Sequence, residues 1–295
     1  DAESGNITLY KSDDTQIQAF DVTSDISGSG GTAITINPTS DLAEQTSYYV
    51  QIAAAAFDDA AGNSYAGITD ETSWNFTTAD ETAPTVSSVT SSTSDGAYKI
   101  GDEIAITVTF SEAVTVTGTP QLTLETGDTD AVVDYASGSG STTLTFNYTV
   151  AAGHTSSDLD YASTSALALN SGTIKDAAGN DATLTLSEPG GGTSLGSNKD
   201  IVVDGVVPTL SSLSPADDAT DASPNSNLTI TFSEEMAAGS GDLIIKKSSD
   251  DSEYESIGAS SDKITISGAV ATVNPAKDME TSTQYYVTVA SGMFK

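Results

Sequence analysis

Apolar side chains recur at every second position in several stretches of this chain. The segments Ile104–Phe110, Leu144–Tyr148 and Leu228–Phe232 alternate in this way and are rich in Thr, Val, Ile and Tyr. Such alternation is typical of β-strands, because successive side chains of a strand point to opposite faces. Clusters of Gly, Ser, Asp and Asn, such as 27–31 and 137–140, separate the stretches. No amphipathic helix is predicted, and the many short strands favour an all-β protein built of β-sandwiches.

The chain also repeats part of its own sequence. Residues 4–12 return as 240–248, and the stretch Ser47–Val50 returns as Gln284–Val287 with its Tyr-Tyr-Val sequence unchanged. Self-similarity at a fixed spacing is the mark of a modular array. A tandem array in turn points to a structural or adhesive role.

Two similar linkers predict the module boundaries. Residues 80–89 and 204–213 each place an acidic residue four positions before a proline, and a new strand follows. Proline stiffens such a junction and blocks ladder pairing. The predicted modules are 1–79, without its N-terminal strands, 80–204, which is complete, and 205–295, without its C-terminal strands. We expect the polypeptide to continue beyond both ends; the alternative is that neighbouring subunits supply these strands by β-addition.

Composition narrows the possible partners. The chain has 42 acidic and 9 basic residues, a formal charge of −33, and no cysteine. Such a charge repels nucleic acid and anionic membrane surfaces and favours cation binding. Disulfides and Cys-ligated metals are excluded, so the chain must be stabilised by packing or by hard cations with oxygen ligands. No stretch has the apolar length of a membrane span, so direct membrane insertion is not expected.

Several motifs together resemble the bacterial Ig-like domains of S-layer proteins and large surface adhesins. In the outer modules they are Tyr48–Val50, Phe57–Asn63, Trp74–Thr78 and Phe232–Met236, and in the middle module Phe110–Val114 and Lys175–Asn180. The resemblance covers nearly the whole chain. It implies tandem, elongated Ig-like β-sandwich modules that are extracellular, non-enzymatic and often associated with calcium.

In an Ig-like sandwich successive strands run alternately up and down. The loops after the second and sixth strands therefore lie at the same pole as the start of the module, and oxygen donors from these three segments should meet there. In module two, Glu112 is predicted to end the second strand, Asp176 and Asn180 lie in the later loop, and Asp80 and Glu81 lie at the entrance. Ca²⁺ takes about six to eight oxygen ligands. The sequence therefore predicts a calcium site at the junction of modules one and two.

The outer modules carry parts of the same set of ligands. Asp204 and Glu234 are the candidates for module three, and Asp58, Asp59 and Asn63 are those for module one. A structural alternative applies to all of these loops. Asp-Ala-Ala-Gly-Asn forms a good turn by itself, because Asp and Asn bond the local backbone and Gly takes a positive φ.

Signals for catalysis are weak. His154 is the only histidine, and a lone histidine builds no multi-His metal site. Gly192–Gly196 matches the Gly-x-Ser-x-Gly pattern by letter but is predicted to lie in a loop, whereas that motif needs a strand before it and a helix after it. Trp74, the only tryptophan, is expected in the core of the last strand. The Tyr pairs 48–49 and 285–286 are each expected to place one ring inward and one outward.

The sequence thus predicts a non-enzymatic repeat region of an extracellular bacterial protein, located at the cell surface or secreted. Its role would be that of a spacer or stalk, with neighbouring modules or adjacent subunits as partners and a surface glycan or protein as target. A subunit of a self-assembling surface layer or filament is one alternative. Carbohydrate-binding accessory modules of a secreted enzyme are another.

Overall fold

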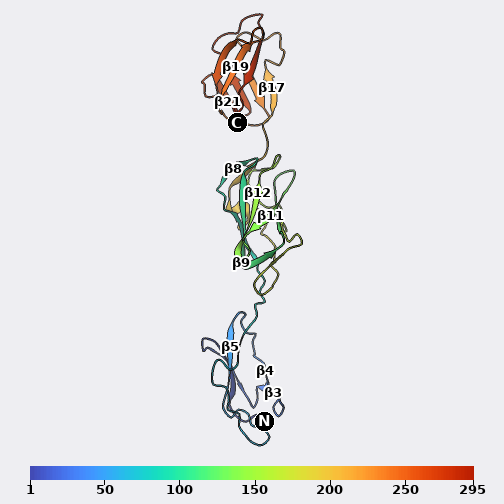
Figure 1. Ribbon diagram of the computed structural model, residues 1–295, viewed down its shortest axis with the longest axis vertical. Coiled ribbons are helices and arrows are strands. Elements are labelled where there is room, and N and C mark those ends of the chain that lie inside the picture. Colours follow the sequence, from blue (N-terminus) through green and yellow to red (C-terminus); the bar gives the residue numbers. More distant parts are fainter. The chain divides into compact units, whose positions relative to one another are not determined.

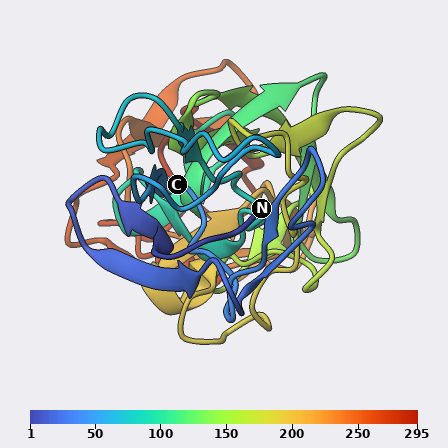
Figure 2. The same cartoon turned by 90° about the horizontal axis from the view of Figure 1, so that it is seen from below.

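The computed structural model describes residues 1–295, and nearly all of its regular structure is β-strand. Figures 1 and 2 show arrows joined by loops, and the one helix, α1 (Leu195–Asn198), is a single turn. The prediction of an all-β protein is confirmed. The chain forms two compact units, residues 1–205 and 206–295, and each is described by itself. It contains no helix with the length and apolar character needed to cross a membrane.

Residues 1–79, called module one below, form a four-stranded sheet and a separate two-stranded ribbon. The sheet has the order β2-β1-β5-β6 with antiparallel neighbours, and β3 pairs with β4. Ile7, Leu9, Phe20, Tyr48 and Val50 are fully buried and form its core. The strands are β1 (Asn6–Lys11), β2 (Gln16–Asp21), β3 (Ile26–Ser27), β4 (Thr35–Ile36), β5 (Ser47–Ile52) and β6 (Asn75–Thr77).

Two expectations about the aromatic residues of the outer modules are wrong. Trp74 lies just before β6 and is 43% exposed, so it is not a core residue. Tyr48 and Tyr49 are both buried, because the ring of Tyr49 stacks on Tyr10 at 5.0 Å between centroids and its hydroxyl donates to Asp14. The equivalent pair 285–286 is half-buried at both positions.

Residues 80–204, called module two, contain the largest core. One sheet has the order β14-β10-β11-β12-β9-β15 with β7 also paired to β9, and a smaller one has the order β13-β16-β8. Ile104, Ile106, Leu122, Leu144 and Phe146 have no exposed surface. The strands are β7 (Val86–Ser91), β8 (Gly96–Lys99), β9 (Glu103–Thr117), β10 (Gln121–Leu124), β11 (Ala131–Ser137), β12 (Ser141–Thr149), β13 (Thr155–Ser156), β14 (Leu167–Ala168), β15 (Thr173–Lys175) and β16 (Ile201–Asp204).

The sequence predicted that a strand ends at Glu112, but β9 continues past this residue to Thr117. It runs for 15 residues, and its second half pairs with β15. Its ladder with β12 shifts register between the pairs Thr109–Thr143 and Val114–Ser141. The extra residues of β9 in this interval form an irregularity that includes Glu112. Bulges of this kind bend a strand and re-aim its side chains.

Residues 206–295, which with Gly205 make up module three, form two facing sheets. One has the order β17-β18-β22-β21 and the other the order β20-β19-β23. The core contains Leu243, Ile245, Ala271, Val273 and Met293, all without exposed surface. The strands are β17 (Leu210–Ser214), β18 (Leu228–Phe232), β19 (Asp242–Lys247), β20 (Glu253–Gly258), β21 (Ile264–Ser267), β22 (Val270–Val273) and β23 (Tyr285–Val289).

Candidate metal centre

Backbone hydrogen bonds fix the entrance of module two on both sides. The Thr85 N–H donates to Ser111 Oγ at 3.0 Å, and the Ser111 N–H donates to the Thr85 carbonyl at 2.8 Å. The Thr183 N–H donates to the Pro84 carbonyl at 2.8 Å. Ser111 directly precedes Glu112, and Thr183 closely follows the loop 176–180. The entrance is therefore held beside both the irregular part of β9 and this loop.

The loop 176–180 is shaped by its own side chains. Asp176 Oδ1 accepts the N–H groups of Gly179 at 2.7 Å and Asn180 at 2.8 Å, and Gly179 has a φ of 101°. The Asn180 amide nitrogen donates to Asp176 Oδ2 at 2.8 Å and to the Asp80 carbonyl oxygen at 3.0 Å. Asn180 thus ties the loop to the linker, and in this structure it acts as a hydrogen-bond donor rather than as an oxygen ligand.

Three carboxylates meet at this place. Asp80, Glu112 and Asp176 each present a carboxylate oxygen, and these oxygens lie within 4.8 Å of one another. Asp176 is buried, while Asp80 and Glu112 are partly buried. The neighbouring cation, Lys175, pairs with Asp181 at 2.7 Å. In residues 1–295 no other three carboxylate or imidazole side chains come together this closely.

The pKa values reflect this crowding. Burial raises the pKa of Glu112 above its ordinary value, and the charges of Asp80 and Asp176 raise it further. Burial also raises the pKa of Asp176, but hydrogen bonds from the Asn180 side chain and from nearby backbone N–H groups outweigh it, so the net shift is downward. The surroundings of Asp176 therefore favour its ionised form, whereas those of Glu112 make its ionisation less favourable. A positive charge at the centre of the group would relieve this conflict.

The donor set suits a hard divalent cation. Carboxylate oxygens are the preferred ligands of Ca²⁺, which also accepts backbone carbonyls and tolerates irregular geometry. Repulsion among three clustered anions in a partly buried place is unfavourable without a counterion. A bound ion would link the linker at Asp80, the irregular part of β9 at Glu112 and the loop at Asp176.

Glu81 does not join the cluster. It is exposed, and its backbone N–H donates to Glu44 Oε2 at 3.3 Å. The Thr82 hydroxyl donates to the same oxygen at 2.6 Å. Glu44, which belongs to a loop of module one, was not singled out in the sequence, because no motif marks it. It holds the linker from the module-one side.

In module one the corresponding loop has the same turn but no cluster. Asp59 Oδ1 accepts the N–H groups of Ala61 and Asn63, both at 2.8 Å, and the Asn63 amide nitrogen donates to Asp59 Oδ2. These bonds, that of the Asn63 side chain first, lower the pKa of Asp59. Asp58 stands apart from them, with a buried Oδ1 that has no hydrogen-bond partner.

The two candidates for module three belong to different compact units. Asp204 is exposed at the end of β16 in the first unit. Glu234 follows β18 in the second unit, and its Oε1 is buried without a hydrogen-bond partner. The entrance pair of module two recurs here, because the Thr209 N–H donates to Ser233 Oγ and the Ser233 N–H donates to the Thr209 carbonyl.

The residues considered for catalysis have structural roles. Ser194 is buried and caps the N-terminus of α1 by accepting the Ser197 N–H at 3.2 Å. A loop precedes it rather than a strand, so the Gly-x-Ser-x-Gly letters do not form a nucleophile elbow. His154 Nδ1 is 2.9 Å from the Tyr148 hydroxyl, and the two rings stack.

Comparison with known proteins identifies the family of these modules. No curated protein and no solved structure gives a significant match to the chain. The family model described as bacterial Ig-like domain matches three times, at residues 2–78, 80–187 and 204–295. The predicted Ig-like repeats are thereby confirmed, while the finer likeness to S-layer proteins and adhesins stays a prediction. The chain belongs to the bacterial Ig-like domain family.

Proposed function

We propose that the chain is a structural repeat region of a bacterial surface or secreted protein, in which Ig-like modules act as an extracellular spacer or stalk. The modules are 1–79, 80–204 and 205–295, and Ca²⁺ bound by Asp80, Glu112 and Asp176 stiffens the first junction. The convergence of these three carboxylates at the start of module two is the observation that carries the proposal. The family of the modules supports a structural rather than a catalytic role.

The position of the cluster connects cation binding to stiffness. Asp80 lies in the linker between two modules, whereas Glu112 and Asp176 belong to module two. Without an ion, the linker is held by the Asn180 amide on one side and by Glu44 on the other. An ion that takes Asp80 as a ligand would add a third attachment and restrict the linker further.

Calcium titration tests this proposal. We expect binding with a Kd on the order of 10⁻⁴–10⁻³ M, as is typical of extracellular modules, and a rise in the Tm of the chain at millimolar calcium. Glu112→Gln should remove most of this rise. Asp59→Asn changes a carboxylate of the same type in module one and should leave the rise intact. An unchanged Tm of the wild-type chain in calcium, with no heat of binding, would rule the site out.

Small-angle scattering tests the spacer role. We expect an extended particle whose longest dimension becomes better defined when calcium is added, because a stiffer linker narrows the range of conformations. A compact particle would contradict the role of spacer whether or not calcium binds. The partners proposed for the modules are neighbouring modules or subunits, with a glycan or protein as the distal target.

A further inference from the structure

The side-chain amide of Asn180 joins two segments that are far apart in the sequence. Its nitrogen donates to the carbonyl oxygen of Asp80 at 3.0 Å and lies 3.5 Å from that of Thr82, both in the linker. It also donates to Asp176 Oδ2 at 2.8 Å, in the loop 176–180. Carbonyl and carboxylate oxygens only accept hydrogen bonds, so the nitrogen of the amide, and not its oxygen, faces all three. The amide thus ties the linker to the loop.

The backbone of Asn180 is held by the loop independently of the amide. Its N–H donates to Asp176 Oδ1 at 2.8 Å, and its carbonyl accepts the Asp176 N–H at 3.2 Å. Beside the loop, Lys175 and Asp181 form an antiparallel bridge. None of these contacts involves the side chain of Asn180. A substitution at this position can therefore remove the tie to the linker while the backbone bonds of the turn remain.

The loop 59–63 of module one provides a matched reference. The Asn63 N–H donates to Asp59 Oδ1 at 2.8 Å, and its carbonyl accepts the Asp59 N–H at 3.0 Å. The Asn63 amide nitrogen donates to Asp59 Oδ2 at 2.8 Å, within the same loop, and to no second segment. The same substitution at Asn63 therefore measures the cost of altering the turn alone.

The amide and the proposed ion would connect the same two segments. An ion bound by the carboxylates of Asp80 and Asp176 would join the linker to the loop, as the amide does through the Asp80 carbonyl and Asp176 Oδ2. A hydrogen bond to a charged acceptor is roughly twice as strong as one between neutral groups. The amide is neutral, however, so it leaves the repulsion among the three carboxylates in place. It replaces the ion as a tie but not as a counterion.

We propose that the Asn180 amide takes the place of the ion as the tie between linker and loop when no ion is bound, so that residue 180 sets how far the order of the linker depends on calcium. The dependence on calcium rests on the proposed function, whereas the tie itself does not. Asn180→Asp nearly keeps the shape of the side chain, removes its N–H groups and adds a fourth carboxylate beside Asp176. In this variant the linker is released without calcium and is held again when an ion neutralises the group.

Cleavage by a glutamate-specific endoproteinase gives the first test, because Glu81 is exposed in the linker. This protease needs no calcium, and mass spectrometry identifies the fragments 1–81 and 82–295. In EDTA we expect the cut after Glu81 to be about tenfold faster in Asn180→Asp and Asn180→Ala than in the wild type, because cleavage follows the population of the opened segment. Asn63→Asp should leave this rate unchanged.

The same digestion at millimolar calcium tests the replacement of the amide by the ion. We expect the rate in Asn180→Asp to fall to that of the wild-type chain, since an ion binds only the folded, closed arrangement of linker and loop. Calcium should therefore change the rate of this variant about tenfold more than that of the wild type, which the amide already protects in EDTA. In Asn63→Asp the effect of calcium should equal that in the wild type.

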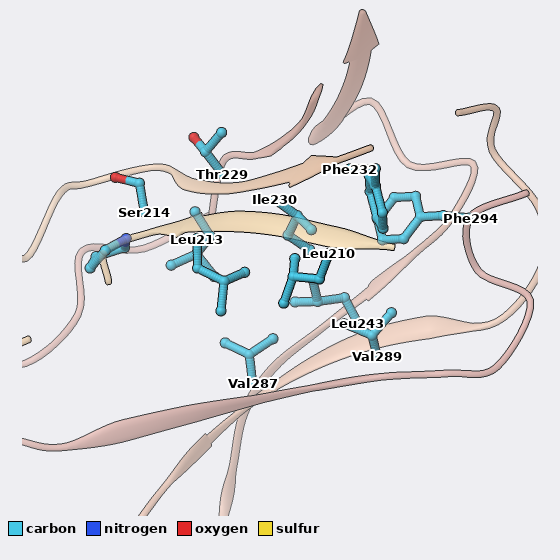
Figure 3. A pocket seen from close by; sticks show the side chains of 12 residues that line it. Leu210, Leu213, Ser214, Thr229, Ile230, Phe232, Leu243, Val287, Val289 and Phe294 are labelled. Carbon is cyan, nitrogen blue, oxygen red and sulfur yellow. The ribbon is translucent and has the colours of Figure 1, made fainter. Parts of the chain in front are cut away.

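Hydrogen exchange separates a local effect from a general one. Exchange in linker peptides should follow the cleavage rates, whereas peptides of module three should not change. The hollow between β17, β18 and β23 of that module is lined by apolar side chains such as Leu213, Ile230 and Val287 and by no charged one (Figure 3). Calcium therefore has no ligand there. Equal changes in the linker and in these peptides would mean that the variants are destabilised throughout, which would overturn the proposal.

Two results would show that the amide does not tie the linker. One is an unchanged cleavage rate in EDTA for both Asn180 variants, and the other is an equal increase in Asn63→Asp. Two further results concern the ion. If calcium protects the wild-type linker but not that of Asn180→Asp, the calcium site stands and the replacement of amide by ion is wrong. If calcium protects neither linker while the difference in EDTA remains, the calcium site is wrong, and the amide is a permanent tie rather than a substitute for an ion.

Discussion

The loops 59–63 and 176–180 have the same sequence, the same turn and different surroundings. In each, an aspartate accepts two backbone N–H groups and an asparagine amide. Only the second loop has two further carboxylates beside it, contributed by the linker and by the irregular part of β9. The motif therefore specifies a turn, and the cation site arises from the segments that the fold brings to it.

Core substitutions should have the largest effects on stability among the tests of this difference between the two loops. Phe146→Ala removes a fully buried ring from module two, and Phe20→Ala does the same in module one. Each should lower the free energy of unfolding of its module by about 3–5 kcal/mol, because a cavity remains. Urea unfolding with and without calcium should show that only Phe146→Ala changes the calcium-responsive transition. Loss of the calcium response in Phe20→Ala would mean that the site is not confined to module two and its linker.

Substitution of the loop glycines tests the turn itself. Gly62 and Gly179 have φ values of 85° and 101°, and a Cβ added to either meets no atom within 4 Å. Alanine in these positions should therefore cost about 1–2 kcal/mol, from backbone strain alone. We expect similar losses of stability in the two variants by urea unfolding. Calcium affinity should fall only in Gly179→Ala, and an equal calcium response in both would contradict the difference between the loops.

Adjacent acids in the linker sharpen the comparison further. Asp80→Asn removes one of the three clustered carboxylates, whereas Glu81→Gln changes an exposed neighbour. Isothermal titration should show calcium affinity lower by about tenfold in Asp80→Asn, since the number of charged ligands tunes affinity. It should be nearly unchanged in Glu81→Gln. If the two variants weaken binding equally, the linker acts through its overall charge and not through one ligand.

The smallest effect expected is a pH dependence in the absence of calcium. The pKa of Glu112 is raised from 4.5 by burial and by the two neighbouring carboxylates. Between that value and the raised one, the folded state holds more protons than the unfolded state, so stability falls as pH rises. Glu112→Gln should remove this slope and raise the Tm at pH 7 in EDTA. A lower Tm of this variant at pH 7 would show that the Glu112 carboxylate stabilises the calcium-free fold.

The sequence allowed much of the candidate centre to be predicted. Asp80, Glu112 and Asp176 were expected at one pole and do lie together, but Glu112 reaches the group from an irregularity within β9 and not from the end of a strand. The role of Asn180 was not predictable, since whether its amide donates or accepts depends on the position of the Asp80 carbonyl. The continuation of β9 beyond Glu112 was missed because Ser111 and Glu112 interrupt the apolar alternation, as a bulge does.

The burial of the aromatic residues also could not be predicted from the alternation of apolar and polar positions. Tyr49 is buried by contacts with Tyr10 and Asp14 on the face that alternation assigns to solvent. Trp74, just before β6, is 43% exposed although it was expected in the core. In both cases burial depends on which segments pack across the sheet, and the period of one strand contains no information about them.

The paired hydrogen bonds between Thr85 and Ser111 also determine how the array responds to a pulling force. Tension that reaches module two through its linker acts on β7 along its length, and these two bonds are the first to carry it. The Thr183–Pro84 bond on the other side shares the load, so several bonds must fail together. Forced rupture depends on the barrier to unfolding rather than on equilibrium stability. Since Thr209 and Ser233 repeat the arrangement, the mechanical strength of modules two and three is set within a few residues of the linker before each.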